Sequence, residues 1–216
     1  MKKLFYQFGL LVVVSLFLNS CGATLEAMRQ ATTDEGVVIN GVRWATRNVE
    51  RSGSFVVNPE DVGMLFQWNN RTAWQLRDFA GAPWAVGNFT WNREISYGTE
   101  WNPRSSPCPP GWRVPTIEEM QSLVNAGSEW TVRNEVPGRL FGTAPYQIFL
   151  PVAGSRGGNN GALTGIGVQG LYWSSTDVRD ENLDRARRLF FNESEAGETV
   201  NPADRGSAFT IRCVAE

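Results

Sequence analysis

Short apolar runs separated by polar or glycine-rich connections dominate the chain from residue 36 onward, a pattern typical of β-strands. The first two runs, at residues 37–39 and 42–44, flank Asn40 and Gly41. Because Asn-Gly favours the tight type I′ turn, this segment predicts a β-hairpin. Further strands are expected at residues 147–153, 171–175, 188–191 and 208–213.

A single clear helix is indicated between Thr116 and Gly127. Apolar residues recur there at helical spacing, at Ile117, Met120, Leu123 and Val124. Thr116 followed three residues later by Glu119 is the capping box that starts a helix, and Gly127 favours its end. One helix, several short strands and long loops at residues 81–103 and 154–170 predict an α+β fold.

The N-terminus has the pattern of an export signal. Two lysines precede an apolar run at residues 4–18, which is shorter than the about 20 residues that a membrane span needs. The run ends in Leu-Asn-Ser-Cys-Gly at residues 18–22, which resembles the lipobox of bacterial lipoproteins. We therefore expect a signal peptide at residues 1–20, a lipid on the thiol of Cys21 and a tether at residues 21–35. An ordinary signal peptide with a chance cysteine is the alternative.

The composition then excludes several catalytic mechanisms and kinds of binding site. Loss of residues 1–20 leaves 18 Arg, no Lys and no His, and 18 Arg against 22 Asp and Glu give a net charge of −4. The absence of His excludes a Ser-His-Asp triad, a Cys-His dyad and a His-ligated zinc ion. The absence of Lys excludes a Schiff-base or P-loop lysine. An acidic balance without a basic tract argues against nucleic acid as a partner.

Export to an oxidising compartment also indicates the state of the cysteines. With Cys21 assigned to lipid, Cys108 and Cys213 remain, and an even pair in an oxidising compartment indicates a disulfide. The bridge would close a loop of about 100 residues, worth up to about 4.7 kcal/mol on the chain-entropy model. Two buried free thiols are the alternative.

Several motifs occur together in a fixed order. They lie at residues 40–49, 58–64, 67–69, 108–116, 149–156, 172–176 and 211–214. In this order they resemble the Fibrobacter succinogenes major paralogous domain family, over residues 36–216. The resemblance implies a C-type-lectin-like fold with a twisted antiparallel β core, one or two helices and long irregular loops. It also implies a C-terminal strand beside the N-terminal part, joined to the helix region by Cys108–Cys213. The family carries no common activity, although the fold hosts sugar and protein binding.

Tryptophans are the first candidates for ligand binding. Trp84, Trp91 and Trp101 lie in irregular sequence, where exposed rings could stack on a sugar or a partner. The alternative is a cluster that packs the loop at 81–103 onto the core. Trp173 is the fourth candidate, because the lectin-like fold would place it near the contact face. Its strand-like surroundings favour core packing, as they do for Trp44, Trp68 and Trp112.

Acidic residues supply two weaker candidates. Asp180, Asn182 and Asp184 have the alternating oxygen ligands of a calcium loop, but Arg185 and Phe191 exclude an EF-hand. A looser calcium site is the hypothesis, and a charged hairpin tip is the alternative. No other cofactor is expected. A separate acidic set could supply the paired carboxylates of a glycan hydrolase; it comprises Glu193, Glu195 and Glu198.

These observations favour a protein that binds rather than catalyses. The first hypothesis is a lipid-anchored protein of the outer membrane, facing either the cell surface or the periplasm. Its lectin-like domain would bind a glycan or protein partner through Trp173, the loop at 154–170 and the tip at 177–185. A structural or assembly component of the envelope is the second hypothesis. A carboxylate-based glycan hydrolase is the third.

Overall fold

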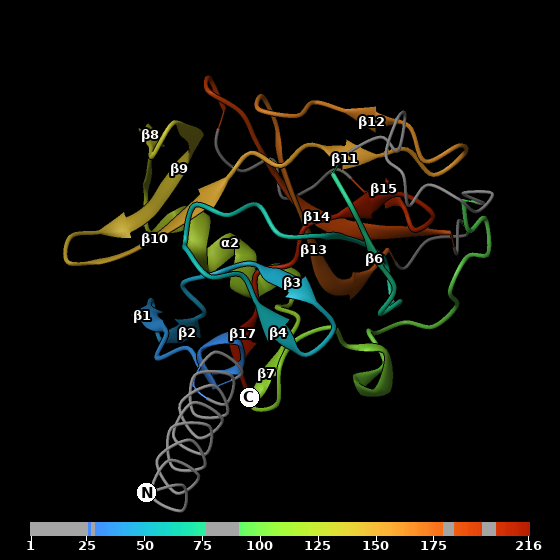
Figure 1. Cartoon of the computed structure of the whole chain (residues 1–216), viewed down its shortest axis with the longest axis horizontal. Helices are drawn as coiled ribbons and strands as arrows, with labels where there is room; N and C mark the ends of the chain where they lie inside the picture. The colour runs from blue at the N-terminus through green and yellow to red at the C-terminus, as the bar shows by residue number, and fades with distance from the viewer. Residues whose placement is uncertain (1–25, 27–28, 77–90, 179–183, 196–201) are drawn as a thin grey trace, which may run out of the picture.

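The computed structural model describes residues 26, 29–76, 91–178, 184–195 and 202–216 (Figure 1). Short strands in five antiparallel sheets surround the helix at residues 117–125, and residues 26 and 29–32 are also helical, so the α+β expectation is confirmed. Within this described part, no helix is both long and apolar enough to cross a membrane.

The first half of the chain contributes small sheets. Its strands are β1 (Val37–Ile39), β2 (Val42–Trp44), β3 (Val49–Arg51), β4 (Ser54–Phe55), β5 (Leu65–Gln67), β6 (Ala73–Trp74) and β7 (Trp112–Arg113), with the 3-10 turn η1 at Pro103–Ser105. The predicted hairpin is confirmed as β1 and β2, and Asn40 and Gly41 both have the positive φ of a type I′ turn, at 49° and 82°.

The helix α2 spans Ile117–Asn125, as predicted. The Thr116 hydroxyl accepts a hydrogen bond from the Glu119 backbone N–H, and the Glu119 carboxylate accepts one from the Thr116 backbone N–H. This capping box satisfies two donors at the helix start. Met120 and Leu123 bury the apolar face of α2 against Phe141, Tyr172 and Phe191, which belong to two different sheets.

Longer strands make up the second half of the chain. They are β8 (Ser128–Arg133), β9 (Val136–Thr143), β10 (Tyr146–Pro151), β11 (Ser155–Arg156), β12 (Leu163–Thr164), β13 (Gly170–Asp177), β14 (Arg185–Phe191), β15 (Ala203–Asp204), β16 (Ala208–Phe209) and β17 (Val214–Ala215). Three sheets have the orders β10-β9-β8, β13-β14-β15 and β12-β11-β16-β5-β6. The fourth, β1-β2-β17-β7, places the C-terminal strand beside the N-terminal hairpin.

The structure departs from the sequence expectations in three places. The expected strand at 208–213 is interrupted, because residues 210–213 cross the core between β16 and β17. The expected loop at 154–170 contains the short strands β11 and β12. The expected tether at 21–35 ends in a docked residue, since the Asp34 carboxylate accepts hydrogen bonds from the backbone N–H groups of Gly36 and Thr46.

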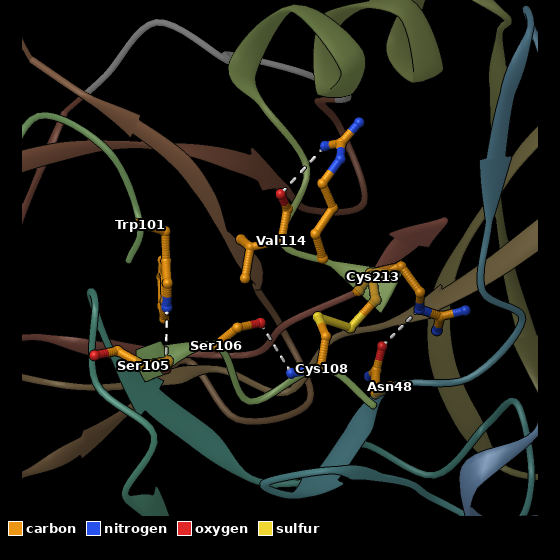
Figure 2. Close-up of a disulfide and its surroundings, with 9 residues drawn as sticks. Asn48, Trp101, Ser105, Ser106, Cys108, Val114 and Cys213 are labelled. Carbon is orange, nitrogen blue, oxygen red and sulfur yellow. Dashed lines mark hydrogen bonds between the residues drawn. A yellow bond between two sulfur atoms is a disulfide. The ribbon is translucent and has the colours of Figure 1, made fainter. Parts of the chain in front are cut away.

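The disulfide between Cys108 and Cys213 is present, with an S–S distance of 2.07 Å. It joins the segment before β7 and α2 to the segment before β17, across 105 residues of sequence. The four tryptophans for which core packing is expected, Trp44, Trp68, Trp112 and Trp173, are all buried. Figure 2 shows the bridge with Trp101 and Val114 on one side and Asn48 on the other.

Next to the disulfide, Arg212 is completely buried. Its guanidinium donates to Asn48 Oδ1 at 2.8 Å, to the Ala45 carbonyl at 3.1 Å and to the Phe149 carbonyl at 2.9 Å. Desolvation by burial lowers the pKa of Arg212 to about 10. The charge therefore persists at neutral pH, and its hydrogen bonds join three distant segments of the chain.

Tyr172 completes this buried network. Its hydroxyl donates to the Pro151 carbonyl at 2.7 Å and accepts from Asn48 Nδ2 at 3.3 Å. Burial raises the pKa of Tyr172 to about 12, so the phenol stays neutral and keeps its proton for Pro151. Asn48 thus connects the two large polar side chains of the core.

We expect Arg212→Lys to lower the free energy of unfolding by about 3 kcal/mol, because one ammonium cannot reach all three acceptors on the two segments and leaves buried carbonyls unpaired. Urea unfolding followed by tryptophan fluorescence measures the change. Arg51→Lys, at an exposed position, is the matched control and is expected to be neutral. Equal stability of the two variants would contradict the role assigned to Arg212.

Candidate functional site

A groove of about 800 Å³ opens beside the disulfide. Most of its lining comes from three walls: the segment around η1, the segment from Cys108 into α2, and the end of β13. Gly53, Arg71 and Glu216 complete the lining. The volume lies in the range of about 300–1,000 Å³ that is usual for ligand sites. We take this groove as the candidate binding site.

Hydrogen bonds hold the three walls together. The Trp101 backbone N–H donates to the Ser175 carbonyl at 3.2 Å, and the Ser175 N–H donates to the Pro115 carbonyl at 2.7 Å. The Thr176 hydroxyl accepts from the Ile117 N–H at 3.0 Å, which satisfies another donor at the start of α2. The groove is therefore shaped by the fold before any ligand arrives.

Arg113 is held on one wall by Glu119. Two guanidinium nitrogens donate to the two carboxylate oxygens at 2.8 and 2.6 Å, which is the bidentate geometry of a strong ion pair. Burial disfavours the ionised Glu119 carboxyl, but hydrogen bonds from Arg113 and the Thr116 backbone outweigh it and hold the pKa of Glu119 below its usual value. The same hydrogen bond raises the pKa of Arg113.

The groove has an excess of acidic side chains. Its charged lining residues are Arg71, Glu100, Arg113, Glu118, Asp177 and Glu216. Glu119 neutralises Arg113, and Asp177 attracts the buried Arg205. Among the described lining residues, Arg71 is then the cation outside an ion pair, set against the carboxylates of Glu100, Glu118 and Glu216. Such a site disfavours phosphate, sulfate and sialic acid, and it accepts neutral or cationic ligands.

The tryptophan expectation is corrected for two residues. Trp173 is fully buried and donates its indole N–H to the Phe66 carbonyl at 2.8 Å. Trp91 is 6% exposed, donates to the Gly158 carbonyl and packs on Trp74. Neither ring offers a face to a ligand, because the interior satisfies both its apolar surface and its polar N–H.

Trp101 is the candidate tryptophan that borders the groove. It is 7% exposed, packs against Trp68 with ring centroids 5.7 Å apart and donates its indole N–H to the Ser105 carbonyl. Figure 2 shows this bond at η1. The ring therefore supplies an edge to the groove, and its packing matches the alternative of a loop fastened to the core. Trp84 lies outside the described residues.

The acidic candidates among the described residues do not line the groove. Asp180, Asn182 and Glu198 lie outside the described residues, and Asp184 is exposed. Glu193 and Glu195 are exposed in a loop organised by hydrogen bonds to the Asn192 side chain, and neither lines the groove. In the part of the chain that can be described, no three acidic or cysteine side chains gather as a metal site.

The sequence did not reveal the groove residues as a set. Arg113 and Thr116 stand in the motif at residues 108–116, where the sequence predicts only the cap formed by Thr116. Thr176 and Asp177 lie some 60 residues further on, and Glu100 precedes the disulfide. The local signal was the capping box alone, and the pairing of Glu100 with Thr176 depends on the fold.

Comparison with family models, curated proteins and solved structures gave no match to this chain. The α+β class of the protein therefore rests on its own strands and helix.

Replacing Glu119 by Gln keeps the cap but removes the ion pair, so we expect a loss of about 1 kcal/mol at pH 7. The folded-state pKa of Glu119 lies below the unfolded value of 4.5, so this contribution is complete above pH 4.5 and disappears as the pH falls through the folded-state value. Urea unfolding of both proteins between pH 3 and pH 7 measures it. Glu118→Gln, at an exposed neighbour, is the control. A stability difference that is unchanged at pH 3 would contradict the charge effect.

Proposed function

We propose that this protein is a lipid-anchored envelope protein whose domain binds a neutral glycan in the groove beside the disulfide. The domain would belong to the Fibrobacter succinogenes major paralogous domain family and have a C-type-lectin-like fold. The position of β17 between β2 and β7, and the Cys108–Cys213 bridge, support that fold.

The groove is the observation that carries the proposal. It combines the size of a ligand site with walls that are already hydrogen-bonded to each other. A preorganised site loses less conformational entropy on binding than a flexible one. Polar groups of the lining, such as Glu118 and Arg71, can bond to sugar hydroxyls, while the edges of Trp101 and Trp112 contact the apolar faces of the sugar.

Charge favours a neutral glycan over an anionic one. Glu100, Glu118 and Glu216, set against Arg71 as the cation outside the described ion pairs, repel sulfated or sialylated chains. The proposed ligand is therefore a neutral oligosaccharide, the class of glycan that is recognised through hydroxyl groups and ring faces.

The residue types available favour binding over catalysis. The chain after residue 20 has no His and no Lys, and Cys108 and Cys213 are joined to each other. The His, Lys and Cys routes to a general base or nucleophile are therefore missing or occupied, and carboxylates are the acid/base groups that remain. The acidic set proposed for hydrolysis has two described members, both in an exposed loop away from the groove.

The anchor is proposed from the N-terminal sequence. The basic start, the apolar run at 4–18 and Cys21 fit a lipoprotein signal. Several acyl chains at about 0.8 kcal/mol per buried CH2 would keep the protein on the membrane. The outer membrane is the proposed location.

A glycan array tests the binding site. The wild-type protein is expected to bind neutral glycans, and Arg71→Gln/Glu118→Gln is expected to weaken binding about tenfold, because two exposed groove groups lose their charged hydrogen bonds. Arg93→Gln/Glu94→Gln is the matched control, since it changes the same residue types at exposed positions outside the groove. Equal loss in both variants, or no glycan bound, would argue against the site; stable co-purification of an envelope protein without glycan binding would favour an assembly role.

Intact mass spectrometry of the mature protein tests the anchor. We expect an N-terminal Cys21 carrying a diacylglycerol, and Cys21→Ser is expected to leave the precursor uncleaved and unlipidated. An unmodified Cys21, or cleavage at another residue, would contradict the proposed anchor.

A further inference from the structure

The strand β8 is the outer strand of a three-stranded sheet. The order β10-β9-β8 leaves one side of β8 without a neighbouring strand among the described residues. Figure 1 shows this sheet projecting beside α2, with β8 at its outer end. An exposed strand edge of six residues offers a row of backbone donors and acceptors for another strand.

The hydrogen bonds of β9 show which backbone groups of β8 point outward. The Gly142 N–H donates to the Gly127 carbonyl, and the Val152 N–H donates to the Pro137 carbonyl. The Gly127 carbonyl therefore points towards β9, while the Pro137 carbonyl points towards β10. Because these directions alternate along a strand, Ser128, Trp130 and Val132 direct their backbone groups to the open side of β8.

The side chains on one face of β8 carry opposite charges, and the Arg133 guanidinium lies over the ring of Phe149 in β10, 5.5 Å from its centroid. Glu129, Thr131 and Arg133 lie opposite Leu140, Gly138 and Val136. Glu129 and Arg133 are exposed, and within the described residues neither takes part in an ion pair. The strand thus has a negative charge two residues before Thr131 and a positive charge two residues after it.

We propose that β8 pairs with β8 of a second copy of this chain, antiparallel and centred on Thr131. Glu129 of each copy then faces Arg133 of the other, Trp130 faces Val132, and Thr131 faces Thr131. Opposite-charge, aromatic with β-branched, and Thr–Thr pairs are the cross-strand pairs that stabilise sheets. The strand is complementary to itself in all three respects.

Only this register satisfies both the backbone and the charges. It places the outward groups of Trp130 opposite those of Val132, so both pairs exchange hydrogen bonds. If one β8 strand is shifted by one residue against the other, residues whose backbone groups point to the open side lie opposite residues whose backbone groups point back to β9. A shift by two residues places Glu129 or Arg133 opposite Thr131 and loses the charge pairs.

Such a dimer would be a six-stranded sheet with two ligand grooves. None of the groove residues lies in β8, so both grooves remain open. Two anchored, linked sites would raise the avidity for a repetitive glycan. The pairing itself rests on β8 alone and does not depend on what the groove binds.

Disulfide trapping tests the pairing in the full-length chain in native membranes. In a non-hydrogen-bonded antiparallel pair, opposite Cα atoms are about 4.5 Å apart, within disulfide range. Thr131→Cys is therefore expected to give a covalent dimer under mild oxidation. Val57→Cys, 77% exposed elsewhere on the molecule, controls for random collision, and Val132→Cys controls for register. The wild-type chain controls for its own cysteines.

Charge exchange in the Thr131→Cys background tests the partner. Glu129→Arg or Arg133→Glu alone places like charges opposite each other twice, so we expect the dimer to weaken about tenfold. The double variant restores opposite charges and is expected to restore cross-linking. Three results would each overturn the proposal: cross-linking of Thr131→Cys no greater than that of Val57→Cys, a double variant as weak as the single ones, or cross-linking to a protein of different mass.

Discussion

A buried guanidinium is the constraint on which the rest of the structure depends. Arg212 is charged at neutral pH and lies in an apolar interior, so each of its donors needs an acceptor. Those acceptors come from Ala45 and Asn48 in one segment and from Phe149, which lies about 100 residues further along the sequence. The N-terminal hairpin region, β10 and the C-terminal segment must therefore meet at one point for the fold to form.

The groove depends on this meeting point. Cys213 follows Arg212 directly and fixes Cys108, so the disulfide extends the Arg212 network to the segment that leads into β7 and α2. Loss of the buried hydrogen bonds would destabilise the core and also the groove wall that begins at Cys108. Three further buried arginines, Arg139, Arg156 and Arg205, also donate to backbone carbonyls of distant loops. Lys cannot reach several separated acceptors, which gives a physical reason for a domain with many Arg and no Lys.

The sequence predicted what local chemistry determines. The Asn40-Gly41 hairpin, the Thr116 capping box and the cysteine pair each depend on one or two residues, and all are present. The β8–β9 hairpin was not anticipated, because Asn134 and Glu135 form its positive-φ turn without a glycine. The role of Arg212 and the groove could not be predicted either, since their partners meet only through tertiary packing. In the sequence, the arginines contribute only to the net charge. In the structure, several of them are buried hydrogen-bond donors.

Native-state hydrogen exchange at the Arg212 network tests the central claim most directly. The Ala45 N–H donates to the Cys213 carbonyl at 2.9 Å and the Val49 N–H donates to the Ile211 carbonyl at 3.2 Å, so both amides report on the contact between the two ends of the domain. If this contact holds the fold together, both amides exchange only through global unfolding, with the free energy that denaturant unfolding gives. Exchange through a local opening of much lower free energy, while β13 and β14 stay protected, would contradict the account.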